Sequence, residues 1–261
     1  MPDCIYSDII IPIKTKNIGG VFMPNKINQS FILAAGRGKR MLNLTNDKPK
    51  PLVTVANKCL IDYNVEHIQK VDIDNCVVNL CYLGDMIRDH LQQQYPDFNF
   101  IFSDEEEALE TGGGIKHALP KMKREAFFVI NSDALWLDEK GSDLLQNMMN
   151  SWDDDKYDMM LMLQPMDKAY GVSGNGDYNI VDNRPVRRTS PDEHVPYLYG
   201  GVLICHPRVF DNEPEGKYWL IGIFDRLQQQ NRLGFYIHDG EWFHVGDPKA
   251  REIAEEKIST L

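Results

Sequence analysis

A short glycine loop and two basic residues stand out as groups that could do chemistry. The apolar run FILAA, residues 31–35, opens into GRGKR, residues 36–40, and Lys50 follows ten residues after Arg40, between two prolines. Glycines let the backbone approach an anion, and loop amides at a helix N-terminus can cradle phosphate. Arg40 can grip phosphate oxygens with two parallel bonds, and Lys50, predicted to be extended between its prolines, adds a point charge. This order predicts chemistry on the polyphosphate of a nucleotide.

Two better-known phosphate loops do not fit this stretch. A P-loop requires GxxxxGK followed by serine or threonine, but Lys39 is followed by arginine and the first glycine is misplaced. A dinucleotide fingerprint needs glycine or alanine at position 41, where this chain has Met41, and no acidic residue ends a second strand at the required distance. The remaining interpretation is a nucleotidyltransferase loop.

A second glycine cluster lies in LETGGGI, residues 109–115. Three consecutive glycines predict that the backbone passes close to something flat or bulky. Thr111 is placed to cap the helix that we expect to follow.

A third feature is an apolar strand that ends in Asn-Ser-Asp. Asp133 closes the run FFVINSD, residues 127–133. Open α/β sheets bind their ligands at the carboxyl ends of parallel strands, and a hard cation prefers carboxylate oxygen together with substrate phosphate. We therefore expect Asp133 to bind Mg²⁺. The acidic runs 104–107 and 153–155 are interpreted instead as solvated loops.

The elements that must position these groups alternate between strand and helix. Strands are predicted at 31–35, 76–83, 98–102 and 126–131, and helices at 60–70, 84–94, 111–119 and around 144–149. This rhythm predicts an α/β protein with a mostly parallel sheet and helices on both faces. After Trp152 the pattern becomes mixed, with strands at 159–164, 178–181, 197–205 and 235–238 and helices at 220–230 and 248–258.

Composition limits the partners. The chain has 261 residues and a formal net charge of -11, which argues against nucleic acid or an anionic membrane as a partner. The five cysteines are scattered without a CxxC pair, so we expect reduced thiols of a cytoplasmic protein and neither a disulfide framework nor a zinc site. No apolar run is long enough to span a bilayer. Residues 1–28 are predicted to be an accessory or poorly ordered extension.

From Phe31 onward the chain resembles the sugar-1-phosphate nucleotidyltransferases, whose signature is LAAGxGxRM followed by PKPL. The segment LETGGGI and the compact length resemble the subgroup of N-acetylmuramate-1-phosphate uridylyltransferases, which act in cell-wall recycling, and their mannose-1-phosphate guanylyltransferase-like relatives. The resemblance implies a Rossmann-like, GT-A-like fold. Residues 29–261 would form one domain, with a nucleotide-binding half at 29–151 and an added mixed sugar-binding half at 152–261.

The resemblance also implies a set of site residues. Arg40 and Lys50 are the expected catalytic cations, and Asp133 is the expected metal ligand. The sugar is expected near Asp177, Gly200 and Gly201, while aromatic residues such as Trp152, Tyr199, Trp219 and Phe224 are interpreted as core. The nucleotide is expected to contact Leu33, Ala34, Ala35, Gly36, Gly38, Lys39, Thr111, Gly112 and Gly113.

One position departs from the family. The segment WFHVGDP, residues 242–248, matches the family's WxDVGTP, but His244 replaces an aspartate that anchors a second metal ion. Imidazole suits transition metals better than Mg²⁺. Three explanations stay open: His244 binds a softer ion such as Mn²⁺ or Co²⁺, the second ion is dispensable or is held by Asp133 and substrate phosphates, or activity is reduced or lost. Asp247 is expected to cap the last helix instead.

The expected reaction joins an NTP, with UTP favoured, to a sugar 1-phosphate and releases pyrophosphate. N-acetylmuramate 1-phosphate is the favoured acceptor. Mannose-1-phosphate guanylyltransferase, or synthesis of another NDP-hexose, is the alternative within enzymes. A nucleotide-binding regulator with impaired catalysis is the alternative from another class.

Overall fold

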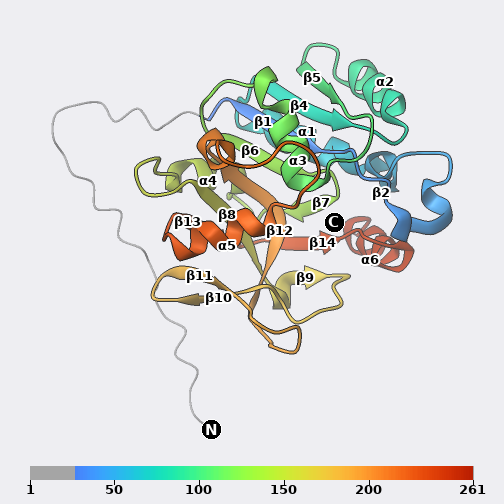
Figure 1. Cartoon of the computed structure of the whole chain (residues 1–261). Helices are drawn as coiled ribbons and strands as arrows, with labels where there is room; N and C mark the ends of the chain where they lie inside the picture. Colours follow the sequence, from blue (N-terminus) through green and yellow to red (C-terminus); the bar gives the residue numbers. More distant parts are fainter. Residues whose placement is uncertain (1–26, 261) are drawn as a thin grey trace, which may run out of the picture.

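One sheet holds most of the strands in residues 27–260, the part of the chain that the computed structural model describes (Figure 1). Its order is β11-β10-β12-β6-β1-β4-β5, and β8 extends it by pairing with β12 and β13. The nine strands are β1 (Gln29–Leu33), β4 (Asn75–Leu80), β5 (Asn99–Asp104), β6 (Phe127–Asn131), β8 (Met159–Pro165), β10 (Tyr178–Val181), β11 (Arg184–Arg187), β12 (Tyr197–Cys205) and β13 (Leu233–Ile237).

The first half of the sheet is parallel, as the alternation of strands and helices predicts. Strands β6, β1, β4 and β5 run parallel to one another, whereas β12 pairs antiparallel with both β6 and β8. Along the chain, β1 is followed by β4 and β5 on one side of it, and the next strand of the sheet, β6, then pairs with β1 on its other side. Such a reversal of strand order opens a crevice at the carboxyl ends of the strands, where ligands bind in α/β sheets.

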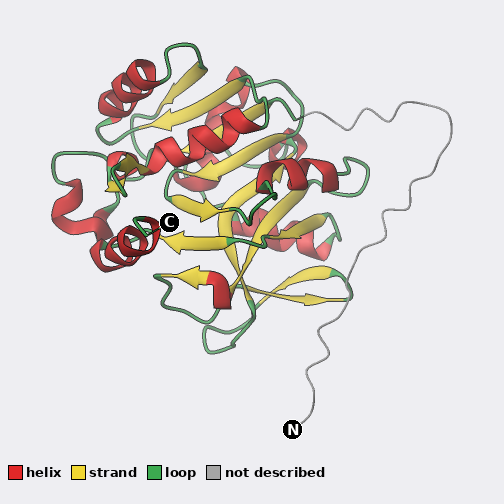
Figure 2. Ribbon diagram, turned by 180° about the vertical axis from the view of Figure 1, so that it is seen from behind, coloured by secondary structure: helices red, strands yellow, loops and turns green. Residues whose placement is uncertain are grey.

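Helices cover both faces of the sheet (Figures 1 and 2). Neighbouring strand residues point to opposite faces, so Phe31 packs in one core cluster and Ile32 in the other. The Ile32 cluster includes residues of α1 (Leu60–Lys70), α2 (Gly84–Gln94) and α4 (Leu144–Ser151). The Phe31 cluster includes residues of α3 (Glu110–Ala118) and α5 (Ile221–Gln229). The predicted layering is confirmed.

A small second sheet was not predicted. Its order is β7-β14-β9, formed by β7 (Ala134–Leu137), β14 (Glu241–His244) and β9 (Ala169–Tyr170). Helix α6 (Pro248–Ile258) packs on β14, and the Asp247 carboxylate accepts a hydrogen bond of 2.9 Å from the Ala250 N–H. The expectation that Asp247 caps the last helix is therefore confirmed. Strands of two to four residues are too short to leave a periodic signal in a sequence.

The remaining short elements are two strands and five 3₁₀ helices. They are β2 (Thr54–Val55), β3 (Lys58–Cys59), η1 (Lys39–Thr45), η2 (Lys50–Leu52), η3 (Leu119–Lys121), η4 (Met166–Lys168) and η5 (Pro207–Phe210). Within residues 27–260, each helix is too short or too polar to cross a bilayer. The predicted extension, residues 1–28, lies almost entirely outside the described residues.

Most predicted elements are present, with shifted ends. Strand β1 ends at Leu33 instead of residue 35, and β4 ends at Leu80 instead of residue 83. Beyond β1, Ala34 and Ala35 are buried although they leave the sheet pairing. Beyond β4, Cys81 and Tyr82 are half-buried and Leu83 is exposed. An apolar run therefore did not mark where the strand ends in either case.

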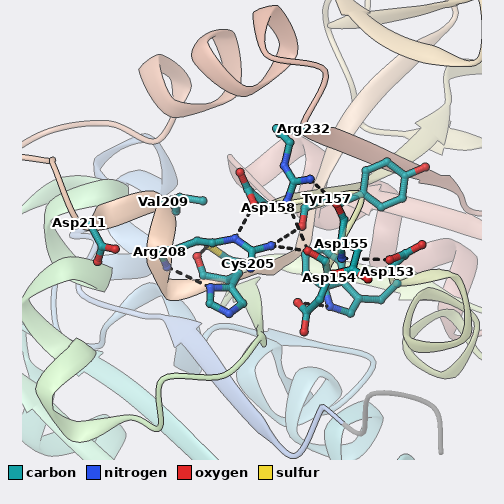
Figure 3. A network of polar contacts seen from close by, with 12 residues as sticks. Asp153, Asp154, Asp155, Tyr157, Asp158, Cys205, Arg208, Val209, Asp211 and Arg232 are labelled. Atoms are coloured by element: carbon teal, nitrogen blue, oxygen red, sulfur yellow. Dashed lines mark hydrogen bonds and ion pairs between the residues drawn. The ribbon is translucent and has the colours of Figure 1, made fainter.

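A polar network links the segments that precede β8 and β13 to the segment that follows β12 (Figure 3). The Asp158 carboxylate accepts hydrogen bonds from Arg208 at 2.5 Å and from Arg232 at 2.7 Å. Both guanidinium groups also donate to the backbone carbonyl of Asp154. The acidic run 153–155 lies in a loop in which Asp153 and Asp155 are exposed, as expected, and the backbone carbonyls of Asp154 and Asp155 are also acceptors in this network.

Candidate active site

A cavity of about 430 Å³ opens at the carboxyl ends of β1, β4 and β6. Many of the predicted site residues line it, including the expected catalytic cations and the metal ligand. They are Leu33, Ala35, Gly36, Gly38, Lys39, Arg40, Lys50, Thr111 and Asp133. The other predicted residues lie outside the lining: Ala34, Gly112, Gly113, Asp177, Gly200, Gly201 and His244.

The glycine loop leads from β1 into the 3₁₀ helix η1. Gly38 precedes η1 with a φ of +65°, and a Cβ at Gly38 would lie 2.8 Å from the Cβ of Lys50. A larger residue would therefore be strained and would displace the lysine. Arg40 is exposed, and its side chain has no ion pair or hydrogen bond within residues 27–260, so this cation is available to an incoming anion.

Lys50 begins a 3₁₀ turn, so the prediction of an extended lysine is wrong. The Leu52 N–H donates to Pro49 at 3.0 Å, and the Val53 N–H donates to Lys50 at 2.9 Å. Pro51 follows Lys50 at the start of this turn, where a missing N–H costs no hydrogen bond. The turn places a lysine that is only 8% exposed in the wall of the cavity.

Lys50 and Asp133 form an ion pair in that wall. Burial alone would raise the pKa of the Asp133 carboxyl, but the Lys50 ammonium and the hydrogen bond that it donates outweigh burial, so the pKa lies below its usual range. Asp133 is therefore a carboxylate at neutral pH. Asp133 lies two residues after the end of β6, and the Ser132 N–H donates to the Leu33 carbonyl at 3.1 Å, which holds this corner against β1.

The second sheet brings His244 to the same corner. His244 of β14 pairs with Ala134 of β7, the residue after Asp133. Burial lowers the pKa of His244 and the cations Lys50 and Arg40 lower it further, although Asp133 opposes them. The imidazole is therefore neutral at pH 7 and has a free nitrogen lone pair to offer a metal ion.

The donor set at this corner fits a divalent ion. Asp133 supplies carboxylate oxygen and His244 supplies imidazole nitrogen, a combination that Mn²⁺ or Co²⁺ accepts more readily than Mg²⁺. Gly246 lines the cavity, and a Cβ at Gly246 would lie 2.0 Å from Nε2 of His244. Glycine at position 246 is therefore required for the His244 ring to lie where it does.

The glycine triplet packs against protein. The N–H groups of Gly112 and Gly113 donate to the carbonyl of Tyr218 at 2.9 and 3.2 Å, so both are already engaged. A Cβ at Gly113 would lie 2.0 Å from the Gly216 carbonyl oxygen. Thr111 lines the cavity, but its hydroxyl accepts a hydrogen bond from the Leu220 N–H at 3.0 Å. The prediction that Thr111 caps its own helix is therefore wrong, because the hydroxyl binds across to the segment before α5.

A buried carboxylate behind the cavity was missed by the sequence analysis. Glu105 is 7% exposed, lines the cavity and accepts hydrogen bonds from Asn79 at 2.7 Å and from the Leu109 N–H at 2.9 Å. Asn79 in turn accepts a hydrogen bond of 2.7 Å from the Ala34 N–H. The acidic run 104–107 was expected to be solvated, which is wrong for Glu105. The sequence feature that could have identified Glu105 is its position just after the end of a strand, which it shares with Asp133.

Of the predicted sugar residues, Gly200 and Gly201 lie in β12, and Asp177 precedes β10 and contacts β12. Gly201 has a φ of +79° within a register shift of this strand, and a Cβ there would lie 3.0 Å from the amide nitrogen of Asn131, which lines the cavity. The Gly200 carbonyl accepts a hydrogen bond from Trp242 at 2.9 Å. The Asp177 carboxylate accepts one from the Tyr199 N–H at 3.0 Å. These residues therefore shape β12 beside the cavity.

A smaller cavity of about 170 Å³ adjoins the first and shares Thr111, Asn131 and Trp219 with it. Its remaining lining is mostly apolar and consists of Tyr199, Leu220, Ile221 and Phe224. Trp219 was expected to be core, but it is 60% exposed and faces both cavities. Phe224 and Trp152 are buried, as expected.

The sequence and the fold are similar to those of known proteins. The family model described as nucleotidyl transferase matches residues 29–259. The chain is 36% identical over 234 residues to an N-acetylmuramate alpha-1-phosphate uridylyltransferase of Caulobacter vibrioides, covering 88% of this chain and 96% of that protein. It is 31% identical over 221 residues to the enzyme of the same name from Neisseria meningitidis, covering 84% and 93%. The solved inositol-1-phosphate CTP transferase of T. maritima matches with a TM-score of 0.72 at 15% identity, over 88% of this chain and 96% of that one.

The chain therefore belongs to the nucleotidyl transferase family, an assignment that the parallel sheet and the glycine loop at its crevice support. Within that family it is a sugar-1-phosphate nucleotidyltransferase.

Proposed function

We propose that this enzyme transfers a uridylyl group from UTP to N-acetylmuramate 1-phosphate and releases pyrophosphate. The observation that carries the proposal is the Lys50–Asp133 pair beside the glycine loop, in a chain that shares 36% identity with a relative named for this activity. The product, UDP-N-acetylmuramate, would place the enzyme in cell-wall recycling.

The reaction needs positioning and charge more than an acid or a base. An oxygen of the sugar phosphate attacks the α-phosphorus of UTP, the bond from that phosphorus to the bridging oxygen breaks, and pyrophosphate leaves. The attacking phosphate is already ionised, so no side chain has to remove a proton. Catalysis then rests on holding the two reactants in line and on cations around the charge that moves to the leaving group.

The residues divide these tasks. Arg40 and the backbone amides of the loop at 36–38 bind the leaving pyrophosphate. Arg40 is a cation without an ion-pair partner in the described residues, and the loop glycines line the cavity, where their amides can donate to phosphate oxygens. Lys50 neutralises charge on the α-phosphate and the incoming phosphate. Asp133 and His244 hold a divalent ion, which supplies further charge neutralisation at the phosphates when bound.

The sugar would occupy the smaller apolar cavity. Tyr199 and Trp219 offer faces for the ring and for its acetyl and lactyl substituents. Asp177 and Gly200 would act through β12, because Asp177 holds the Tyr199 N–H and Gly200 adjoins Tyr199 in the strand.

A matrix of substrates tests the proposal. UTP and GTP are each combined with the 1-phosphates of N-acetylmuramate, glucose and mannose, in Mg²⁺ and in Mn²⁺, and pyrophosphate release is measured. UTP with N-acetylmuramate 1-phosphate should give the highest kcat/KM. A preference for GTP with mannose 1-phosphate would support the guanylyltransferase alternative. Absence of turnover in every combination would favour the regulator with impaired catalysis.

A further inference from the structure

A cluster of three different metal-ligating side chains lies outside the catalytic cavity. Cys59 precedes α1, Asp62 lies in the first turn of α1, and His90 lies in α2. One ligand atom from each of the three lies within 4.8 Å of the other two. Nε2 of His90 is 2.7 Å from Oδ1 of Asp62. None of the three lines the catalytic cavity.

The spacing of the cluster resembles a chelate. Cys59 and Asp62 are three residues apart at the start of a helix, so their side chains meet on one face. The third ligand comes from a separate helix, which lies along the same face of the large sheet as α1. Zinc sites similarly combine ligands that are close together in the sequence with ligands from a distant segment.

We propose that Cys59, Asp62 and His90 form a Zn²⁺ site that is separate from the catalytic metal position. A thiolate and a carboxylate together balance the charge of a divalent ion, and the imidazole completes three ligands. The thiolate favours Zn²⁺ over Mg²⁺, which prefers oxygen ligands. A water molecule would occupy the fourth position.

Little movement is needed to form the site. Tetrahedral zinc with ligand bonds of about 2.0–2.3 Å separates its ligand atoms by about 3.3–3.6 Å. The His90–Asp62 hydrogen bond would therefore lengthen by somewhat less than about 1 Å. On binding, the Cys59 S–H bond breaks and its proton passes to water. Nε2 of His90, which donates to Asp62 in the absence of the ion, gives up its proton to water, and the ligated ring keeps or takes up one proton on Nδ1. The bonds that form are zinc to sulfur, nitrogen and oxygen.

The surroundings admit an ion and orient its ligands. The side chains of Asp62 and His90 are 12% and 20% exposed, and Cys59 is half-buried, so the cluster is reachable from solvent. The Tyr95 hydroxyl is hydrogen-bonded to the same carboxylate. Such outer partners fix the orientation of metal-ligating carboxylates.

The site would also brace the catalytic turn. Sγ of Cys59 is 3.7 Å from the carbonyl oxygen of Leu52, which ends the 3₁₀ turn that begins at Lys50. The Leu60 N–H donates to Val53 at 3.0 Å. Zinc binding would break the S–H hydrogen bond from Cys59 to Leu52, so the Leu60–Val53 hydrogen bond would be the remaining link between the site and the end of the Lys50 turn. Zinc itself would join α1 to α2.

Cobalt is the direct probe, because a thiolate bound to Co²⁺ gives a charge-transfer absorption that oxygen and nitrogen ligands do not give. The full-length, metal-stripped protein is titrated with Co²⁺ and then with Zn²⁺. We expect the band in the wild type and in the matched control Cys81→Ser, but not in Cys59→Ser. It should persist in Asp133→Asn, and Zn²⁺ should abolish it. A wild type without the band, or a Cys59→Ser variant that keeps it, would overturn the proposal.

A second variant covers the case in which Cys59→Ser fails to fold. His90→Gln should weaken Zn²⁺ binding by at least about tenfold in competition with a chromophoric chelator, since losing a ligand costs no less than losing an outer partner. Zn²⁺ should raise the Tm of the wild type and of Cys81→Ser more than that of His90→Gln. Unchanged zinc affinity in folded His90→Gln would also overturn the proposal.

Discussion

The Nζ atom of Lys50 and the carboxylate of Asp133, which are 83 residues apart in the chain, form an ion pair in the wall of the catalytic cavity. The Lys50 ammonium holds the Asp133 carboxyl in the ionised form that the proposed reaction requires. A divalent ion at Asp133 would compete with this contact and would free the ammonium to move towards phosphate. The pair therefore keeps the two groups in place before substrate arrives.

Lys50→Ala should lower kcat by about 10²–10³-fold, the usual cost of removing one group that stabilises transition-state charge. The KM for UTP should change much less. Pyrophosphate release at saturating substrates measures the effect. Lys48→Ala removes an exposed lysine from the same loop, outside the cavity lining, and should retain activity within about threefold. Equal activities of the two variants would refute the role of Lys50.

Asp133→Asn should abolish the response of turnover to divalent ions, because the neutral amide is a weak metal ligand and leaves Lys50 unpaired. Metal titration of kcat measures the loss. Ser132→Gly restores the residue expected from the family pattern and should leave turnover within a few fold of the wild type. A metal response that survives in Asp133→Asn would move the metal site elsewhere.

His244→Asp should shift the metal preference from Mn²⁺ towards Mg²⁺ by about tenfold or more in relative kcat/KM, because carboxylate oxygen replaces imidazole nitrogen. The ratio of rates in the two metals is the readout, so a general loss of activity does not confound it. High wild-type turnover would exclude a decayed enzyme. A ratio that does not change would place His244 outside the metal site.

Asp158→Asn should lower the free energy of unfolding by about 2–4 kcal/mol, because it leaves two guanidinium groups without their shared carboxylate. Asp211→Asn removes the partner of Arg124 in an exposed pair and should lower the free energy of unfolding much less. Urea denaturation of both variants supplies the comparison. Similar losses would show that the Asp158 network adds nothing beyond a surface pair.

The same network predicts how acid destabilises the protein. Burial raises the pKa of Asp158, but the hydrogen bonds from Arg232 and Arg208 outweigh burial and bring the pKa below its usual value. Its stabilisation is therefore complete above the unfolded pKa of about 3.9 and is lost as pH falls through the lower folded value. The stability difference between wild type and Asp158→Asn should shrink below about pH 4. A difference that is constant down to low pH would contradict this.

Gly113→Ala should destabilise the protein by about 1–3 kcal/mol, because the added Cβ would lie 2.0 Å from the Gly216 carbonyl oxygen, which is backbone and cannot swing aside. Gly222→Ala is the matched control. It lies in α5 with no neighbouring atom within 4 Å, and it should stabilise the helix by about 0.5–1 kcal/mol. Thermal unfolding of both variants decides whether packing or backbone freedom explains the triplet. An equal effect of the two substitutions would contradict the packing explanation.

The sequence by itself determined the class of fold, the phosphate loop and the identity of the main charged groups. These features are local: apolar runs of strand length, helical periodicity and residues fixed by a short motif, as in 36–40 and at Asp133. The departure at His244 was also visible, because it breaks a short motif.

Only the tertiary structure decided which charged groups are in contact and which side chains are buried. The contact of Lys50 with Asp133, the burial of Glu105 and the exposure of Trp219 depend on which strands lie side by side, and no short pattern encodes that. The glycine triplet predicted close passage of the backbone by something flat or bulky, and only the structure shows that its neighbours include Gly216 and the Tyr218 ring. The cluster of Cys59, Asp62 and His90 appears only once two helices are placed on one face of a sheet. Chemistry that arises from contacts between distant segments has to be found in the fold.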